Sequence, residues 1–138
     1  MSAGNGAAHE GGCLCGAVRY SAQGEPVGVE YCHCSMCRRA SGAPVVVWAT
    51  YAAEAVAFTQ GRPAEYASSA NGRRGFCNRC GGALTFRWQD RPGEIDVTVG
   101  SLDEPQRFAP GHHIYDADRL PWLTIADDLP RYPASKPK

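Results

Sequence analysis

The chain has 138 residues, of which 43% are hydrophobic and 20% are charged, and its formal net charge is zero. That length and composition suit one globular domain, and the balanced charge disfavours a nucleic-acid binder, which usually carries a basic excess. The longest apolar run, at residues 45–49, is too short to cross a membrane.

The domain organisation is predicted from the composition of the two ends. We expect a flexible leader at residues 1–10, a single zinc-binding domain at 11–132 and a flexible tail at 133–138. The first nine residues are small and polar and lack the pattern of a secretory signal, so the expected location is cytoplasmic. Thiols stay reduced there, and seven cysteines cannot all pair within one chain. The cysteines are therefore expected to bind metal rather than to form disulfides.

Short segments of alternating apolar residues, divided by glycine and proline, predict strands. In chain order they lie at residues 17–21, 27–31, 44–48, 55–58, 84–88 and 95–99, and they are rich in Val, Tyr, Phe and Trp. Only the stretch after Cys34, through Arg38 to Ser41, looks like a helical turn. The prediction is a mainly β domain, a folded-over sheet or open barrel with zinc knuckles at its loops and little helix.

The two outer cysteine clusters each supply two sulfurs. They are Cys13 with Cys15, and Cys77 with Cys80. Zinc prefers thiolates in a tetrahedron, and structural sites fill all four corners from the protein. Counting therefore predicts one closed, structural zinc site, with the glycine after Cys80 suited to a left-handed backbone.

The central cluster supplies three sulfurs within six residues, from Cys32, Cys34 and Cys37. Three protein ligands leave the fourth corner of a zinc ion open, which is typical of a catalytic site. His33 could close that corner, but adjacent residues seldom point the same way on an extended backbone. We therefore expect His33 to be a neighbour of the site that exchanges protons.

Two other interpretations of the cysteines are disfavoured. Buried free cysteines are common and inert, but seven at this spacing would be an improbable coincidence. A thiol-exchange pair at Cys77 and Cys80 is the second, but no thioredoxin-like strand–helix pattern surrounds it.

Charge indicates which chemistry suits the central cluster. Three thiolates overcompensate a dication, so such a zinc ion is a poor activator of water for hydrolysis. It is better suited to bind a substrate thiol at its open corner, because the metal deprotonates that ligand. The expected reaction makes or breaks a bond to a substrate sulfur.

The three cysteine motifs resemble those of the glutathione-dependent formaldehyde-activating enzyme family, which also includes centromere protein V. The motifs are Gly-Cys-Leu-Cys-Gly at residues 12–16, Cys-His-Cys-Ser-Met-Cys at 32–37 and Phe-Cys-Asn-Arg-Cys-Gly at 76–81. The C-terminal signature of the family is similar to residues 100–103, His113-Ile114, Pro121-Trp122 and residues 128–132.

The resemblance implies a β-tent fold and the same partition of the cysteines into a structural and a catalytic zinc site. It also implies a carbon–sulfur lyase that joins a small thiol, possibly glutathione, to an aldehyde such as formaldehyde. His33, Arg38 and Arg39 are candidates for the proton donor or for holding a substrate carboxylate. The alternatives are a non-catalytic zinc module for a protein or nucleic-acid partner, and a redox sensor that uses Cys32 and Cys34. The sequence does not decide the oligomeric state.

Several further residues carry weaker expectations. Trp48, Trp88 and Trp122 are expected to fill the core, and Asp96 to be solvated. Ser41 with Gly42 fits either a place beside the open corner or a simple turn. His112 and His113 are expected to be hydrogen-bonded structural residues, one of which could approach the site.

Overall fold

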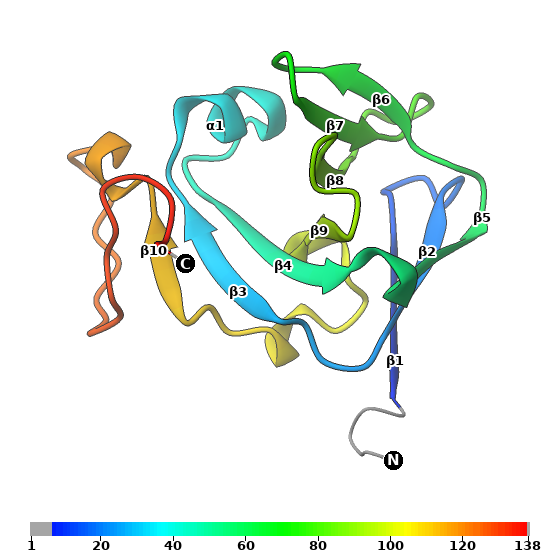
Figure 1. Cartoon of the computed structure of the whole chain (residues 1–138), viewed down its shortest axis with the longest axis horizontal. Coiled ribbons are helices and arrows are strands. Elements are labelled where there is room, and N and C mark those ends of the chain that lie inside the picture. The colour runs from blue at the N-terminus through cyan, green and yellow to red at the C-terminus, as the bar shows by residue number, and fades with distance from the viewer. Residues whose placement is uncertain (1–6, 138) are drawn as a thin grey trace.

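Two antiparallel-rich sheets and one short helix make up the computed structural model, which describes residues 7–137 (Figure 1). The smaller sheet has the order β1-β2-β5, and the larger has the order β10-β3-β4-β9-β8-β7-β6. Among the strand pairs within residues 7–137, only that of β10 with β3 is parallel. The elements are β1 (Ala8–Gly12), β2 (Arg19–Gln23), β3 (Gly28–Cys32), α1 (Ser35–Ser41), β4 (Val46–Ala52), β5 (Val56–Gln60), β6 (Ala64–Ala67), β7 (Gly72–Phe76), β8 (Ala83–Trp88), β9 (Glu94–Thr98) and β10 (His112–Ile114).

The predicted mainly β fold with little helix is confirmed. All six predicted strands are present as β2, β3, β4, β5, β8 and β9, with bounds shifted by a few residues, and the predicted helical turn is α1. Four strands were not predicted, namely β1, β6, β7 and β10. β1 and β7 are rich in glycine and charge, so they lack the apolar alternation that marks a strand in the sequence.

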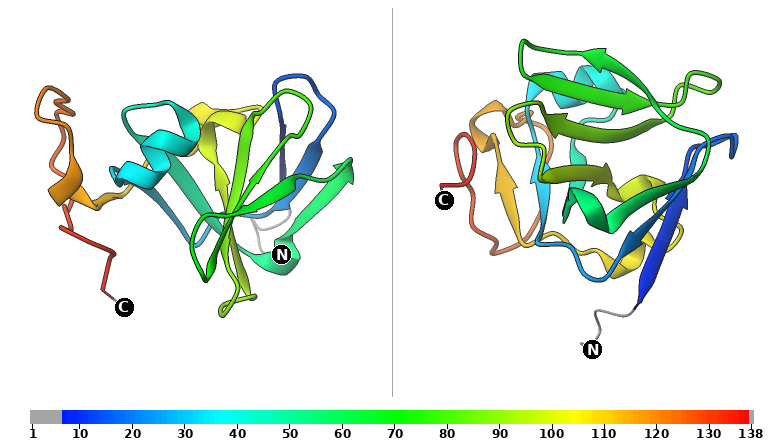
Figure 2. Two further views of the ribbon diagram at one scale, coloured as in Figure 1. Left: turned by 90° about the horizontal axis from the view of Figure 1, so that it is seen from above. Right: turned by 45° about the vertical axis from the view of Figure 1, so that its right-hand side comes forward.

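Parts of the expected leader and tail are hydrogen-bonded to the rest of the domain. Residues 1–6 of the expected leader lie outside the described residues, but β1 begins at Ala8 and pairs with β2. At the other end the backbone N–H of Tyr115 donates to the carbonyl of Ala134, at 2.9 Å. The segment that follows β10 stands to one side of the sheets (Figure 2). No helix within residues 7–137 is long and apolar enough to cross a membrane.

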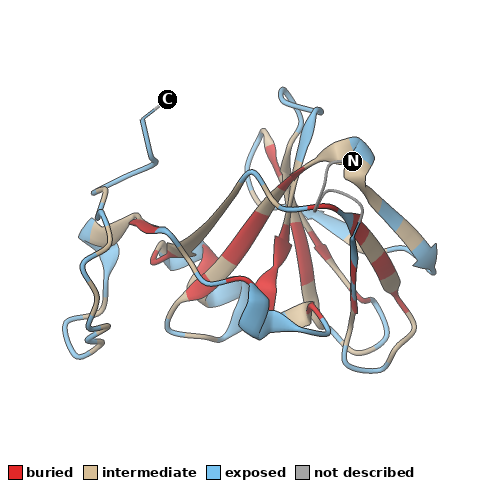
Figure 3. Ribbon diagram, turned by 90° about the horizontal axis from the view of Figure 1, so that it is seen from below, coloured by how far each residue is buried: buried red, intermediate tan, exposed pale blue. Residues whose placement is uncertain are grey.

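β4 separates two apolar clusters, because its side chains alternate between the faces of the sheet. Ala49 and Tyr51 belong to the main core, where Tyr20, Leu84 and Val97 are fully buried. Val46 and Trp48 face the other way and pack in a second cluster that contains Cys32 and Cys37. Buried residues follow these central strands, while the loops and α1 are largely exposed (Figure 3). The central cysteines are therefore part of a packed apolar cluster rather than of a surface loop.

Candidate metal centres and the cavities beside them

The outer cysteines converge as the sequence predicts. Cys15 Sγ lies 3.8 Å from Cys13 Sγ and 3.8 Å from Cys77 Sγ, and the four sulfurs, including that of Cys80, lie within 4.8 Å of one another. Sulfurs held tetrahedrally at about 2.3 Å from a zinc ion are about 3.8 Å apart. All seven cysteines of the chain are free thiols. The spacing fits a closed four-sulfur zinc site and does not fit disulfides.

Two knuckles with left-handed glycines present these sulfurs. Gly16 and Gly81 have φ of 82° and 80°, and the N–H of Gly81 donates to the carbonyl of Cys77 at 2.8 Å. An added Cβ would meet nothing within 4 Å at either glycine, so backbone conformation is the reason for glycine here. Backbone N–H groups of Cys15 and Gly82 lower the pKa of Cys80 to about 6, which favours the thiolate that a metal requires.

The central cysteines form a second cluster where β3 ends and α1 begins. Cys32 Sγ and Cys37 Sγ are 3.4 Å apart, and the three sulfurs lie within 4.8 Å of one another. Cys34 is the N-cap of α1, and its Sγ accepts the backbone N–H of Cys37 at 3.3 Å. Cys32 and Cys37 are buried and Cys34 is half-buried. The half-buried sulfur is thus the one through which solvent reaches the cluster.

An arginine that was not among the residues predicted from the sequence contacts this cluster. Nη1 and Nη2 of Arg74, on β7, lie 3.6 and 3.7 Å from Cys37 Sγ. Hydrogen bonds from Cys32 and Cys37 lower the pKa of Cys34, whereas hydrogen bonding to Cys34 raises the pKa of Cys32. One guanidinium cannot balance three thiolates, so three sulfurs in this spacing suit a dication.

His33 does not complete this site. Its ring is fully buried on the opposite side of the chain, where Nε2 lies 2.8 Å from Nδ1 of His113. His113 in turn bonds Asp127 through Nε2, at 2.9 Å, and stacks on Tyr31 with ring centroids 4.5 Å apart. The predicted hydrogen bonding of His113 is confirmed. The alternation of an extended backbone therefore turns His33 away from the cysteines, as expected.

Neither Arg38 nor Arg39 reaches the central cysteines. Arg38 Nη1 donates to the backbone carbonyls of His33 and Asp118, at 2.6 and 3.0 Å. It therefore links the end of β3 to the segment that follows β10. Arg39 is exposed, and it lines neither of the two cavities described below. Arg74, rather than either of these arginines, contacts Cys37.

A groove of about 510 Å³ opens beside the central cysteines, over one face of the larger sheet. Side chains two residues apart on a strand lie on the same face of the sheet, and such side chains, among them Phe86 and Trp88, form the floor of the groove. Arg74 lies over the Phe86 ring and Arg91 over the Trp88 ring, at 5.0 and 5.3 Å to the centroids. Burial raises the pKa of Glu30 to about 7. The groove is also lined by Cys32, Cys34, Cys37, Trp48, Thr50, Asp96 and Lys136.

Three expectations about single residues are wrong. Trp88, expected in the core, is half-buried and lines the groove. Trp122, expected in the core, is 70% exposed, because it lies in the segment after β10 that stands beside the sheets. Asp96, expected to be solvated, is half-buried in the groove and accepts a hydrogen bond from Thr50 Oγ1 at 2.6 Å. Asp96 does face away from the core, but that face of the sheet is itself the floor of the groove.

The burial of Asp96 predicts a pH dependence of stability. Burial raises the pKa of this carboxyl from 3.8 to about 6, so the folded state favours its protonated form. That stabilisation is complete below the unfolded pKa and is lost as the pH rises through about 6. Asp96→Asn keeps an acceptor for Thr50 and removes the charge. We expect it to raise the unfolding midpoint at pH 7 and to leave it nearly unchanged at pH 4, as measured by thermal denaturation. An equal shift at both pH values would contradict this.

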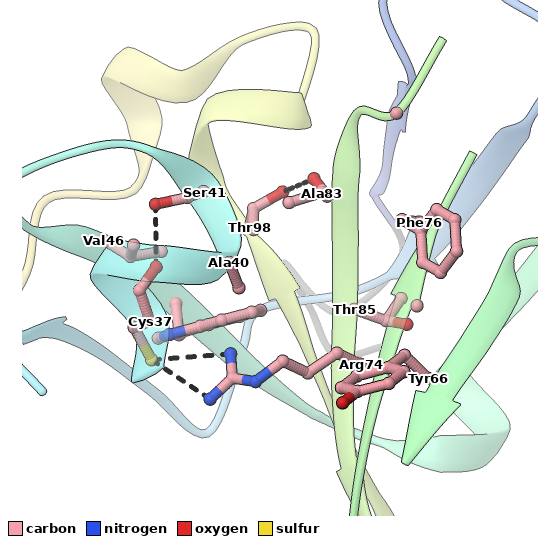
Figure 4. Close-up of a pocket in the computed structure, with 13 residues that line it drawn as sticks. Cys37, Ala40, Ser41, Val46, Tyr66, Arg74, Phe76, Ala83, Thr85 and Thr98 are labelled. Carbon is pink, nitrogen blue, oxygen red and sulfur yellow. Dashed lines mark hydrogen bonds between the residues drawn. The ribbon is translucent and has the colours of Figure 1, made fainter. Parts of the chain in front are cut away.

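A second, smaller cavity of about 250 Å³ lies between α1 and strands β4, β7 and β8 (Figure 4). We refer to it as the helix-side pocket. Ala40 points into it from α1, and Thr85 and Ala83 line it from β8. Ser41 also lines it and donates its hydroxyl to the carbonyl of Cys37 at 2.8 Å, while Gly42 is the left-handed C-cap of α1. Gly42 therefore forms the expected turn, and Ser41 is hydrogen-bonded to the backbone of a central cysteine.

Comparison with known proteins gives this arrangement a family. The family model described as glutathione-dependent formaldehyde-activating enzyme matches residues 8–118, a span that contains all seven cysteines. The chain belongs to this family. A search of curated proteins returned no match.

One solved structure similar to this member of the formaldehyde-activating enzyme family is a Rhodobacter sphaeroides protein from a structural genomics programme. The two chains are 27% identical, the match covers 68% of this chain and 87% of the other, and the TM-score is 0.57. The family assignment agrees with the resemblance seen in the sequence.

Proposed function

We propose that this protein is a zinc-dependent carbon–sulfur lyase that forms or cleaves the adduct of a small thiol and an aldehyde. The observation that carries the proposal is the contrast between the two cysteine clusters. One offers four sulfurs from cysteines that line neither of the two cavities described above, and the other offers three sulfurs that line the groove. A closed and an open site are the expected pair for a structural and a catalytic zinc ion.

The residues that would hold the metals follow from this contrast. Cys13, Cys15, Cys77 and Cys80 would hold the structural zinc ion, and Cys32, Cys34 and Cys37 the catalytic one. A zinc ion at the second cluster would supply a site where a thiol is bound as its nucleophilic thiolate. Because the founding activity of the family uses glutathione and formaldehyde, these are the first substrates to test. The expected location is the cytoplasm, where both sets of thiols stay reduced.

The protein's own groups would orient and stabilise the reactants. The groove positions a thiol against the three sulfurs with Trp48 and Phe86 as apolar walls, and its charged groups suit a polar thiol. When sulfur attacks an aldehyde carbon, negative charge develops on the carbonyl oxygen. Arg74 is the arginine that contacts the cluster, and its guanidinium can donate to that oxygen. The mechanism thus assigns Arg74 the role that sequence reasoning gave to His33, Arg38 and Arg39.

Replacing Arg74 tests this mechanism. Because Arg74→Gln removes a charged donor but no sulfur ligand, we expect kcat/KM for adduct formation to fall by about 10²–10³-fold with zinc content unchanged. The assay follows glutathione and formaldehyde consumption, with zinc measured by elemental analysis.

Arg73→Gln is the matched control, because Arg73 is on the same strand but donates to the Ser69 carbonyl and lines neither cavity. Equal activity in the two variants would remove Arg74 from the mechanism. A wild-type protein that consumes no aldehyde with glutathione or another small thiol would contradict the proposed function itself.

A further inference from the structure

The groove and the helix-side pocket meet at the central cluster. Three residues, Cys37, Trp48 and Arg74, line both cavities, whereas Cys32 and Cys34 line the groove alone. In Figure 4 the guanidinium of Arg74 reaches across the pocket to the sulfur of Cys37. A reaction at the cluster therefore has access to two compartments, one on either side of the Arg74–Cys37 contact.

The two compartments differ in polarity. The groove contains basic residues, among them Arg91 and Lys136, and acidic ones, among them Glu30 and Asp96. Of the described residues that line the helix-side pocket, Arg74 alone is charged, and most of the others are apolar or aromatic. A charged, peptide-like thiol matches the groove, and an apolar group matches the pocket, because desolvating charge in an apolar cavity is costly.

We propose that the helix-side pocket binds the apolar substituent of an aldehyde, so that the enzyme accepts aliphatic or aromatic aldehydes larger than formaldehyde. This inference rests on the proposed function. The size of the helix-side pocket supports this inference. The volume of the pocket is about 250 Å³. One water molecule takes about 30 Å³ in the liquid, so the pocket is far larger than formaldehyde needs. Filling it with apolar atoms would displace water from apolar walls, which is favourable.

The step that joins the two substrates balances without a redox partner. The thiol proton passes to solvent when the sulfur binds as thiolate. A sulfur lone pair then forms the carbon–sulfur bond, and the π pair of the carbonyl moves to its oxygen beside Arg74. A proton from water neutralises that oxygen and gives the hydroxyl of the adduct, so the net reaction is addition of the thiol across the carbonyl.

Filling the pocket from α1 tests this assignment. Ala40 is exposed and both alanine and leucine favour helix, so Ala40→Leu should fold normally while narrowing the pocket. With one thiol held constant, we expect the kcat/KM for isovaleraldehyde to fall by at least about tenfold relative to that for formaldehyde. Ala57→Leu is the matched control, because Ala57 is exposed on β5 and lines neither cavity. It should leave the ratio unchanged.

The outcomes separate this inference from the function on which it rests. If the wild type accepts formaldehyde but not isovaleraldehyde, or if Ala40→Leu lowers both rates equally or neither, the pocket assignment is wrong and the lyase stands. If no aldehyde reacts, the lyase fails, and binding of the unreactive analogue isovaleramide then decides about the pocket. Tryptophan fluorescence should report saturable binding in the wild type and Ala57→Leu, with at least about tenfold weaker binding in Ala40→Leu. No binding, or equal binding in all three, would overturn the inference.

Discussion

Cys77→Ser is expected to remove one zinc ion and to lower the unfolding midpoint by at least about 10 °C, measured by thermal denaturation beside elemental analysis. Cys77 is 1% exposed, and the four-sulfur site joins it to Cys15, 62 positions earlier in the chain. Binding of structural zinc contributes on the order of 10 kcal/mol in small domains, which is comparable to the whole stability of a domain this size. A change at this site should therefore affect the entire fold.

The structural role of the outer zinc site can also be contradicted by this variant. A Cys77→Ser protein that retains its zinc content and its unfolding midpoint would show that the outer cysteines are not a structural metal site. Exhaustive chelation of the wild type gives the same comparison without mutation, and it should also lower the midpoint.

Cys34→Ser is expected to abolish thiol binding and to lower the rate of adduct formation at least about a hundredfold while preserving the fold. Cys34 is the N-cap of α1, and serine is among the best N-cap residues because its oxygen accepts the same backbone N–H. The loss of one sulfur should therefore weaken metal binding at the central cluster without unwinding the helix. The unfolding midpoint should fall by far less than in Cys77→Ser.

This pair of variants also discriminates between the functions that the sequence left open. If Cys34→Ser unfolds the protein as thoroughly as Cys77→Ser, the central metal is structural and a non-catalytic binding module is favoured. A redox sensor would instead release zinc reversibly on mild oxidation, with recovery on adding reductant. The lyase reaction itself involves no oxidation or reduction of the cysteines, so turnover should proceed without release of zinc.

Spacing along the chain was sufficient to predict the central cluster, whose three cysteines lie within six residues, and the count of four ligands that zinc requires joined the two outer pairs. The same holds for the strands with apolar alternation, such as β4 and β9, whose side chains divide between two faces. Local sequence also sufficed for His33, since an extended backbone turns adjacent residues to opposite sides.

Residues that tertiary pairing brings to the site could not be predicted in this way. Arg74 meets Cys37 across 37 positions, through the pairing of β7 with β8, and nothing near Arg74 in the sequence marks that contact. The prediction that Asp96 is solvated was wrong for a related reason. Strand alternation correctly placed Asp96 away from the core, but it lines the groove on the outer face of the sheet and is half-buried there. β7 itself has the sequence Gly-Arg-Arg-Gly-Phe and lacks the apolar alternation of a strand. Its contribution to the groove, through Arg74, therefore could not be predicted either.

Under the proposed function, the three-cysteine cluster holds zinc with one position open to a thiol. Native mass spectrometry of the purified protein, with and without glutathione, measures this directly. We predict two zinc ions per chain and one bound glutathione, and loss of the bound glutathione in Cys34→Ser. A single zinc ion, or two zinc ions with no bound thiol at saturating glutathione or another small thiol, would contradict the open catalytic site and leave only the structural one.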